Sequence, residues 1–450
     1  MPPSAPAAER LNIVFFLVDD LGWADVGCNG STFHQTPHID RLAAAGMRFT
    51  DAYTGGSVCS PTRASLMTGK HPVRVNITDW IPGCGVPKNK PLIVPDDEDH
   101  LALEETTLAE ALKDGGGYRT FYAGKWHLGG EPYAPDKQGF DVYFDPHGDP
   151  AKGSPAKLKP GQVRPHDTRG ITREALRFLD DNHGKAPMFL YLAFYDVHTP
   201  IVADDETLAD YRARAKDLGP SPKPIKEGSG VSRPRQDGAA YGSMVSIVDW
   251  SVGQVTAKLE SLGIADDTAI VFFSDNGGLC TLGNRPGPTS NAPLRSGKGW
   301  LYEGGIRAPL IVKAPGVKPG ATTAAPAVSM DLYPTLLAIA GLPPRPDQHL
   351  DGISLMPALK GEPMPADRTL YWHYPHYHGS AWKPGAAMRA GDWKLIEFYE
   401  EERAELYRLS DDLGEQHDLA KAEPAKLAEM RQKLRDWQAA MGARLPTKRQ

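Results

Sequence analysis

Short runs of apolar residues punctuate the first two thirds of this 450-residue chain. Four of them, at 11–18, 118–123, 188–195 and 268–274, are rich in β-branched and aromatic residues. Strands of this composition are buried on both faces, as in a parallel sheet that is covered by helices. We therefore predict an α/β fold with a large, doubly wound, mostly parallel sheet flanked by helices.

The segments between these runs predict the helices that cross over from strand to strand. Segments 38–47 and 107–113 are candidates, and the glycines at 115–117 end the second. A third helix is indicated by apolar residues spaced alternately by three and four from Val245 to Leu262. We interpret its valines as core residues that pack on the sheet.

The pattern changes after the proline-rich stretch 343–346. Segments 369–374, 388–399 and 405–407 predict strands, and 424–441 predicts a closing helix with one apolar face. We expect residues 10–345 to form the large catalytic domain. Residues 346–450 are expected to form a smaller subdomain, with an antiparallel sheet and the closing helix, that contributes to a substrate pocket.

Each of the four buried runs is followed directly by polar side chains. In a doubly wound sheet, the carboxyl ends of the strands are where binding sites form. These side chains are therefore expected to meet at one edge of the sheet. They are Asp19 and Asp20, Lys125 and His127, His198, and Asp275 and Asn276.

Four of these side chains offer only oxygen ligands: Asp19, Asp20, Asp275 and Asn276. Such a set suits Ca²⁺ or Mg²⁺ and excludes a typical zinc site, because no histidine or thiolate joins them. An isolated pair of adjacent aspartates is ordinarily a solvated turn. The second pair, at the end of another buried strand, favours a metal site here.

A Cys-x-Pro-x-Arg motif occupies residues 59–63. The segment 60–69 predicts a short helix, which places Cys59 at an N-terminus where free backbone N–H groups favour anions. Arg63 lies one turn further and can reach back toward Cys59. The plainer alternatives are a surface salt bridge for Arg63 and a helix-start proline for Pro61.

These motifs, in this order, resemble the signature of type I sulfatases in the alkaline phosphatase superfamily. The resemblance extends from about Leu11 to at least Arg307 and includes Lys298. It implies a sulfuric ester hydrolase in which a formylglycine-generating maturation enzyme oxidises Cys59 to formylglycine. The hydrated aldehyde then offers one hydroxyl to attack sulfur and a second whose deprotonation expels sulfate, which a thiol cannot do.

The resemblance also implies roles for the other residues. Lys125 binds sulfate, and His127 is the base for sulfate elimination. His198 and Lys298 surround the scissile oxygen, and either could protonate the leaving alcohol. The cation, Ca²⁺ with Mg²⁺ as the alternative, binds the four oxygen ligands and the modified Cys59. The plainer alternatives are that His198 is a hydrogen-bonded core histidine and that Lys298 is an ordinary loop lysine.

A cluster of histidines and aromatic residues near the C-terminus predicts the substrate. His373, His376 and Trp382 are the candidate substrate-binding residues, because aromatic faces and imidazoles suit sugar rings and hydroxyls. The run from 373 to 397 is similar to bacterial sulfatases that act on polysaccharide fragments, although a structural patch is an equal competitor. With the long loops 129–167 and 200–239, the cluster predicts a deep pocket and an exo-acting enzyme for sulfated sugars.

Three other functions compete with a carbohydrate sulfatase: an arylsulfatase, a phosphonate or phosphate ester hydrolase, and a catalytically silent sulfate-binding protein. Rates on matched aryl sulfates and phosphonates would separate the hydrolases. The sequence does not reveal the sugar, the sulfated position or the oligomeric state.

The composition and charge of the chain limit the kinds of partner and cellular location that we expect. The formal net charge is −6 and the isoelectric point about 6.2, which gives no reason to expect a nucleic-acid or anionic-membrane partner. No run approaches the roughly 18 apolar residues of a membrane span. Four scattered cysteines, at 28, 59, 84 and 280, make a disulfide framework unexpected. The chain as it stands predicts a cytoplasmic protein, or a periplasmic or secreted one if a signal was trimmed.

Overall fold

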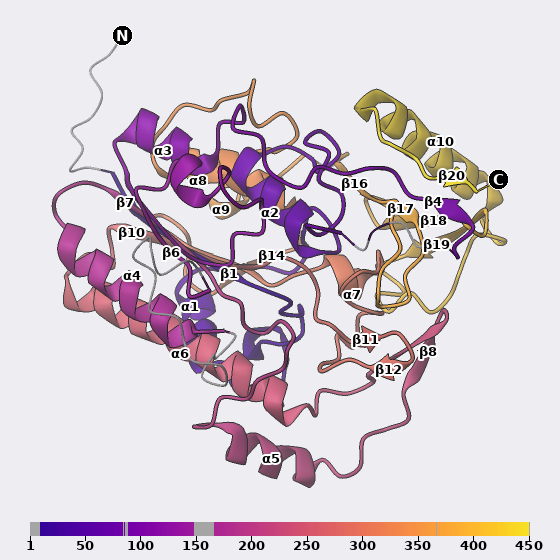
Figure 1. The fold of residues 1–450 in the computed structure, drawn as a ribbon, viewed down its shortest axis with the longest axis horizontal. Helices are drawn as coiled ribbons and strands as arrows, with labels where there is room; N and C mark the ends of the chain where they lie inside the picture. Colours follow the sequence, from indigo (N-terminus) through magenta and orange to yellow (C-terminus); the bar gives the residue numbers. More distant parts are fainter. Residues whose placement is uncertain (1–9, 84, 86–88, 148–165, 366, 450) are drawn as a thin grey trace.

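The computed structural model describes residues 10–83, 85, 89–147, 166–365 and 367–449, and within them an eight-stranded sheet forms the centre of the fold (Figure 1). Its strands, in spatial order, are β14 (Ala321–Thr323), β2 (Met47–Phe49), β13 (Leu310–Lys313), β10 (Thr268–Ser274), β1 (Asn12–Val18), β7 (Met188–Ala193), β5 (Arg119–Gly124) and β6 (Val142–Phe144).

The four predicted strands are neighbours in the middle of this sheet. β1 pairs in parallel with β10 on one side and with β7 on the other, and β7 pairs in parallel with β5. Every residue of β1, β7 and β10 is buried, as the apolar runs indicated. β13 runs antiparallel to both of its neighbours, so the sheet is mostly parallel, and the predicted fold class is confirmed.

Helices cover both faces of the sheet (Figure 1). One face packs against α1 (Pro37–Ala45), α4 (Thr168–Asn182) and α6 (Ala239–Ser261), and the other against α2 (Cys59–Thr68), α3 (Leu108–Gly116) and α8 (Leu332–Ile339). Val248 and Val252 of α6 are fully buried, so the three predicted helices and the core role of the valines are confirmed.

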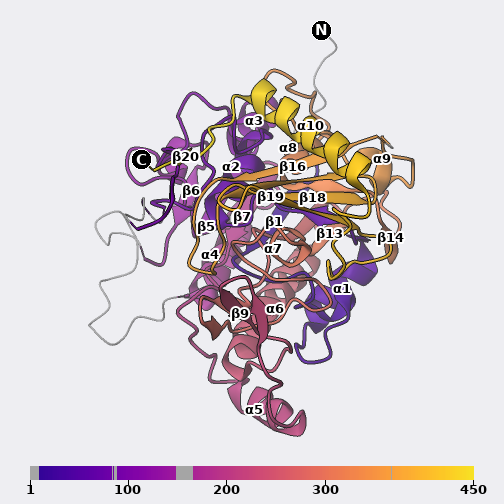
Figure 2. The same ribbon diagram turned by 90° about the vertical axis from the view of Figure 1, so that its right-hand side faces the viewer.

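The C-terminal region forms a second, antiparallel sheet. It contains β16 (Thr369–Tyr374), β17 (Gly385–Ala390), β18 (Trp393–Phe398) and β19 (Arg403–Arg408), in that order. The closing helix α10 (Pro424–Met441) packs on it through Met430 and Leu434 (Figure 2). The boundary between residues 345 and 346 stays a prediction.

One strand prediction was wrong. Segment 388–399 was expected to be a single strand, but it holds the end of β17, a turn, and all of β18. Gly391 occupies the left-handed region at φ +58°, which lets the chain reverse at this point.

The expected loop 200–239 contains regular structure. α5 (Leu208–Asp217) packs against α6 and projects from the lower end of the molecule (Figure 2). β8 (Ile225–Glu227) and β9 (Gly230–Ser232) join β11 (Thr281–Leu282) and β12 (Arg285–Pro286) in a small sheet. The remaining short elements are β3 (Ala52–Tyr53), β15 (Ala327–Val328), β4 (Leu92–Ile93), β20 (Thr447–Lys448), α7 (Glu303–Ile306), α9 (Met356–Leu359) and the 3-10 helices Gly27–Asn29, Pro135–Lys137 and Ser329–Asp331.

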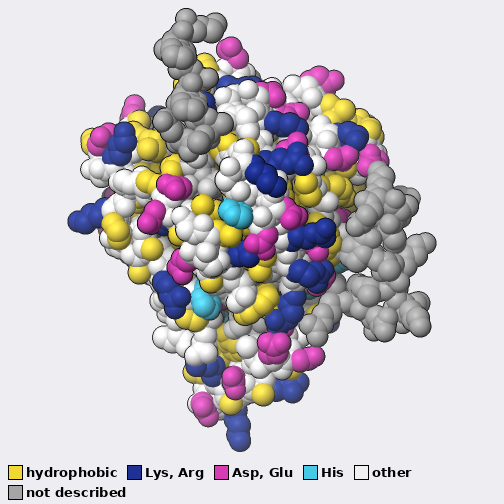
Figure 3. Space-filling view, turned by 90° about the vertical axis from the view of Figure 1, so that its left-hand side faces the viewer, with side chains coloured by type: hydrophobic (Ala, Val, Ile, Leu, Met, Phe, Trp, Pro, Cys, Tyr) yellow, Lys and Arg dark blue, Asp and Glu magenta, His cyan; other side chains and the backbone are white. Residues whose placement is uncertain are grey.

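The surface carries mixed charge. Basic and acidic side chains are interspersed on the face drawn in Figure 3. Among the described residues, no helix combines the length and the apolar character that crossing a membrane requires. Cys28, Cys59 and Cys280 are free thiols, and Cys84 lies outside the described residues.

Candidate active site

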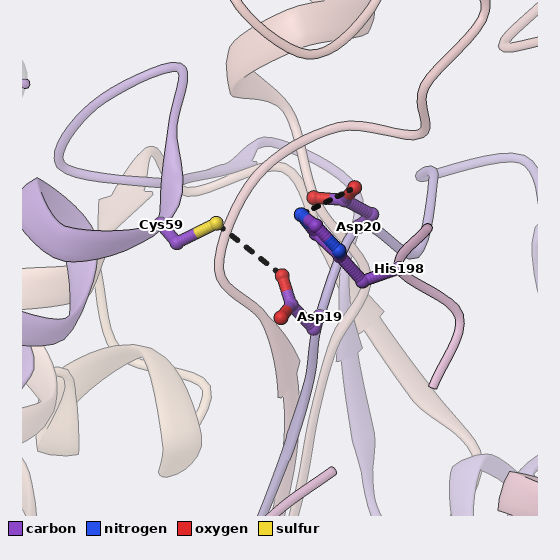
Figure 4. A group of neighbouring side chains, drawn as sticks. All are labelled: Asp19, Asp20, Cys59 and His198. Atoms are coloured by element: carbon purple, nitrogen blue, oxygen red, sulfur yellow. Dashed lines mark hydrogen bonds and ion pairs between the residues drawn. The ribbon is translucent and has the colours of Figure 1, made fainter. Parts of the chain in front are cut away.

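Four neighbouring strands deliver the predicted polar side chains to one place. Asp19 and Asp20 follow β1 directly, and the segments after β5, β7 and β10 supply the others. Figure 4 shows the two aspartates and His198 facing Cys59, which opens α2. The side chains of Asp19, Asp20, Cys59 and His198 lie close enough together to hold one metal ion.

Cys59 lies at the centre of this group and is 1% exposed. Its Sγ lies 3.3 Å from Asp19 Oδ1, and the Nζ atoms of Lys125 and Lys298 each lie 3.4 Å from it. Burial, reinforced by the negative charge of Asp19, raises the pKa of the thiol far above its usual range. The unmodified thiol is therefore protonated at neutral pH and is a poor nucleophile.

The oxygen ligands are held by a network of hydrogen bonds. Arg63 donates from Nε to Asp275 Oδ2 at 2.9 Å, and its Nη2 lies 2.7 Å from the same oxygen. Asn276 donates from Nδ2 to Asp20 Oδ1 at 2.8 Å. Arg63 therefore orients the predicted ligand carboxylates and does not form the surface salt bridge that was its alternative.

The donor set fits a hard cation. Asp19, Asp20, Asp275 and Asn276 are all 0% exposed. Asp20 Oδ2 and Asn276 Oδ1 are buried without a hydrogen-bond partner among the described residues, an arrangement that normally costs free energy. Burial and the charge of Asp19 raise the pKa of Asp275 to about 6, despite the neighbouring Arg63. A divalent cation would satisfy both oxygens and relieve this repulsion.

The sequence in this region is adapted to close packing. A Cβ at Gly277, directly after Asn276, would lie 1.8 Å from the carbonyl oxygen of Gly304. Only glycine lets the strand end and the segment before Arg307 approach so closely, which explains the residue after the predicted ligand pair.

Two lysines place positive charge beside Cys59. Lys298 Nζ lies 2.7 Å from Asp20 Oδ1, and Lys125 Nζ forms an ion pair with Asp19. Burial alone would lower the pKa of both lysines, but the neighbouring carboxylates outweigh it and raise the pKa of each. Both lysines are therefore cations that can bind an anion next to Cys59.

Two histidines complete the group. His127 Nε2 lies 2.5 Å from the carbonyl oxygen of Ile81, which leaves Nδ1 buried and without a hydrogen-bond partner among the described residues. Burial, with the charges of Lys125 and Arg63, holds the pKa of His127 well below its usual range. A neutral imidazole with a free Nδ1 can accept a proton.

His198 has a different arrangement. Its Nδ1 lies 2.6 Å from the carbonyl oxygen of Thr199, and its Nε2 lies 3.8 Å from Asp20 Oδ2. Burial and the charge of Lys298 lower the pKa of His198. Trp126, between Lys125 and His127, is buried in the core.

A cavity of about 540 Å³ opens above Cys59. The catalytic candidates Cys59, Lys125, His127, His198 and Lys298 line it, and the sequence did not single out most of the other lining residues. These are Trp80, His147, His166, Tyr195, Thr199, Pro200, Leu279, Leu282, His378, Gly379 and Ser380.

The loops expected around the pocket contribute unequally. His147 and His166 line the cavity, and residues 148–165 of the expected loop 129–167 lie outside the described residues. Of the segment 200–239, only Pro200 is among the described lining residues. Much of the rest forms α5, β8 and β9 and is not among the described residues that line the cavity, so the predicted place of this segment around the pocket was largely wrong.

The predicted substrate residues lie elsewhere. His373 Nε2 is 3.0 Å from the carbonyl oxygen of Arg444, and His376 Nε2 is 2.8 Å from Thr78 Oγ1. Trp382 is 1% exposed and packs in the interior. None of the three is among the described residues that line the cavity, because each side chain is buried against a neighbouring segment.

His378, in the same cluster, does reach the cavity. No sequence signal distinguishes it from His373 and His376. Tyr195 could have been found by its place in the strand-end segment before His198. Leu279 follows the strand-end segment 275–278 in the same way, whereas Leu282, in β11, has no such signal.

Comparison with known proteins identifies the family. The profile described as "Sulfatase" matches residues 11–342, and that described as "N-sulphoglucosamine sulphohydrolase, C-terminal" matches residues 296–440. This chain belongs to the sulfatase family. The resemblance seen in the motifs is confirmed, and the protein is a sulfuric ester hydrolase.

Individual relatives cover most of this sulfatase. A sulfatase of Formosa agariphila is 31% identical over 96% of this chain and 89% of its own length. The N-acetylgalactosamine-6-sulfatase of Mus musculus is 34% identical over 82% of this chain and 70% of its own. The crystal structure of Ps i-CgsB in complex with k-i-k-neocarrahexaose is 31% identical, with a TM-score of 0.75 and coverage of 95% and 92%.

The fold alone does not separate the competing hydrolases. The phosphonate monoester hydrolase of Agrobacterium radiobacter is 21% identical, with a TM-score of 0.67 over 98% of this chain and all of that one. This similarity shows a shared fold, and the choice of ester rests on the family match.

Proposed function

We propose that this sulfatase releases inorganic sulfate from a sulfated monosaccharide or short oligosaccharide bound end-on, using Ca²⁺ and a formylglycine derived from Cys59. The observation that carries the proposal is the group around Cys59 Sγ, where two lysine ammonium groups and Asp19 lie within 3.4 Å at the base of the cavity.

The chemistry of the site supports oxidation of Cys59 by a formylglycine-generating maturation enzyme. The thiol is held protonated by its surroundings. The hydrated aldehyde supplies a hydroxyl that attacks sulfur and a second hydroxyl whose deprotonation releases sulfate by elimination. The position of Cys59 at the start of the buried helix α2 directs free backbone N–H groups toward the bound anion.

The other residues around Cys59 bind the sulfate group and transfer protons. Lys125 binds a sulfate oxygen and stabilises the charge that spreads over the sulfate in the transition state. His127 accepts a proton at Nδ1 during sulfate elimination. The leaving alcohol is protonated from His198 or Lys298, which lie on the cavity side of the site.

The cation of this proposal is bound by four residues that offer oxygen ligands. Asp19, Asp20, Asp275 and Asn276 would hold it, and the modified residue 59 would complete the set. When bound, Ca²⁺ polarises the sulfate and lowers the pKa of a coordinated hydroxyl, and Mg²⁺ is the alternative. Arg63 keeps the carboxylates in place through its bonds to Asp275.

The cavity supports a sugar as the alcohol component. Its volume of about 540 Å³ falls within the roughly 300–1,000 Å³ typical of small-molecule sites. Trp80 and Tyr195 offer aromatic faces, and His378 and Ser380 offer hydrogen-bonding groups. Among the relatives are an N-acetylgalactosamine-6-sulfatase and a protein crystallised with an oligosaccharide, which supports the same class of substrate.

A panel of sulfated sugars tests this proposal. Protein from a host that matures sulfatases is assayed for sulfate release from sulfated mono- and oligosaccharides, an aryl sulfate and a matched aryl phosphonate. Mass spectrometry of the peptide that contains residue 59 measures the conversion. The proposal predicts an aldehyde at this position, sugar turnover, and no activity in Cys59→Ala.

Three results would each contradict one part of the proposed function. An active enzyme with only the thiol contradicts the formylglycine. Faster phosphonate hydrolysis contradicts the choice of ester. Faster release of sulfate from an intact polymer than from its fragments contradicts end-on binding.

A further inference from the structure

A second cavity, of about 430 Å³, lies between the end of α2, the turn at 73–78 and the C-terminal end of α10. We call it the α10 cavity. Of the described residues that line it, three are cations, Lys70, Arg74 and Arg444, and none is a carboxylate. Such a wall is suited to an anion.

Arg74 and Arg444 each use only part of the guanidinium group for contacts within the protein, so other N–H groups are left to bind a ligand. Arg74 donates through Nε to both oxygens of Asp351, at 3.0 and 2.7 Å. Its Nη1 and Nη2 have no partner among the described residues. Arg444 uses Nη1 for the carbonyl oxygen of Asp96, at 3.3 Å, and its Nη2 has no described partner. Free guanidinium N–H groups match the oxygens of a sulfate group.

The charge of the cavity is positive but modest. Asp351 balances Arg74, and Glu105 balances Lys70 through contacts of 2.9 and 2.7 Å to its Nζ. The charge of Arg444 has no carboxylate partner in the described part of the chain. Glu98 and Asp97 also contact the lining residues Asn76 and Thr78. The cavity therefore carries no large positive charge, which suits one sulfate group on a larger molecule better than a highly charged polyanion.

The other lining residues suit a sugar. Asn76 presents an amide oxygen, and Leu350 and Met441 present apolar surface to the C–H face of a ring. The Thr78 hydroxyl is already bonded to Asp97 and His376. His373 closes the wall through its bond to the Arg444 carbonyl. Burial lowers the pKa of His373 to about 4, so it adds no charge at neutral pH.

The α10 cavity shares two wall segments with the active site. Thr78 and His373 line the α10 cavity, whereas Trp80 and His378, further along the same segments, line the active site. The Cα atoms of Thr78 and Trp80 can be at most about 7 Å apart, since they are two residues apart in the chain. A hydrogen bond between Thr78 and His376 joins these two segments.

We propose that the α10 cavity is a second carbohydrate-binding site, which binds a sulfated sugar of the substrate class through Arg74 and Arg444 and performs no hydrolysis. The assignment rests on the proposed function only for the choice of sugar. Its role is to keep multiply sulfated oligosaccharides on the enzyme, so that it affects affinity and leaves the chemical step unchanged.

Binding is measured by calorimetry on the full-length Cys59→Ala variant, so that the result does not depend on turnover. The probes are a hexasaccharide with several sulfate esters and its desulfated counterpart. Arg74→Ala combined with Arg444→Ala is expected to weaken binding of the sulfated probe at least about tenfold, the equivalent of one charge-assisted hydrogen bond. The matched control is Arg177→Ala combined with Arg212→Ala, which removes two exposed arginines elsewhere.

Kinetics on the matured enzyme give a second readout. The Arg74 and Arg444 variant is expected to raise KM for the sulfated hexasaccharide while kcat, and all constants for a small aryl sulfate, stay the same. The single Arg444→Ala variant, at an exposed position, keeps the test valid if the double variant folds poorly. Unchanged affinity in these variants, or equal binding of both probes, would overturn the second site without affecting the sulfatase assignment.

Discussion

Replacing Lys394 with methionine is expected to weaken the contact between the C-terminal sheet and the segment that carries Lys298. Lys394, in β18, is fully buried, and its Nζ lies 2.9 Å from Glu303 Oε1 and 2.8 Å from Glu415 Oε1. Both acids are 0% exposed, and Glu415 Oε2 accepts the backbone N–H of Glu303 at 2.7 Å. Glu303 opens α7, shortly after Lys298, so this group joins the subdomain to the active site.

The size of the effect follows from what the substitution leaves behind. Without the ammonium group, two carboxylates remain buried and face each other. Breaking a buried ion pair by removing one partner typically costs about 3–5 kcal/mol. We expect a loss in the free energy of unfolding of this order at pH 8.

The loss should depend on pH. Burial and the charge of Glu303 raise the pKa of Glu415 to about 7, although Lys394 opposes them. A folded-state pKa above the unfolded value of about 4.5 means that Glu415 contributes less stability as pH rises through this range. Without Lys394, both acids are more easily protonated, so the deficit of the variant should shrink as pH falls from 8 to 5.5.

Urea unfolding followed by tryptophan fluorescence, at pH 8 and pH 5.5, measures both effects. The control is Lys394→Met combined with Glu415→Gln, in which Glu303 keeps Arg307 as a partner at 3.2 Å. This double variant is expected to recover part of the lost stability. A loss below about 1 kcal/mol at pH 8, or no recovery in the double variant, would refute the assigned role of the buried group.

Three further predictions concern activity. Asp19→Ala should lower turnover and abolish the rise in melting temperature that Ca²⁺ gives to chelator-treated enzyme, and full activity after exhaustive chelation would contradict the metal site. Lys298→Ala should lower kcat on a sugar sulfate by roughly 10²–10³, and by much less on an aryl sulfate with a good leaving group. Equal losses on both substrates would show that Lys298 acts on the sulfate and not on the leaving oxygen. His378→Ala should raise KM for a sulfated monosaccharide several-fold, whereas His373→Ala, which lies outside the active-site cavity, should leave the KM for that monosaccharide unchanged. A higher KM for His373→Ala and an unchanged KM for His378→Ala would support the prediction, made from the sequence, that His373 binds the substrate.

The central strands and their polar ends could be recognised from the sequence alone. An apolar run such as 268–274 identifies a strand buried on both faces, because an exposed strand could not carry so many apolar residues. The carboxyl ends of parallel strands share one edge, so Asp19, Lys125, His198 and Asp275 were expected to meet without knowledge of the loops. The motif at 59–63 added the helix start that faces them.

The walls of the cavity were decided only by the tertiary structure. His373, His376 and His378 are similar in sequence terms, yet the first two are buried against Arg444 and Thr78 and only the third lines the active site. The hairpin within 388–399 and the fold of 200–239 likewise depend on which strands pair. Local patterns specify whether a residue is buried, because burial follows from its own chemistry. Which remote segment covers it depends on the path of the whole chain, and that information is carried by packing between segments far apart in sequence.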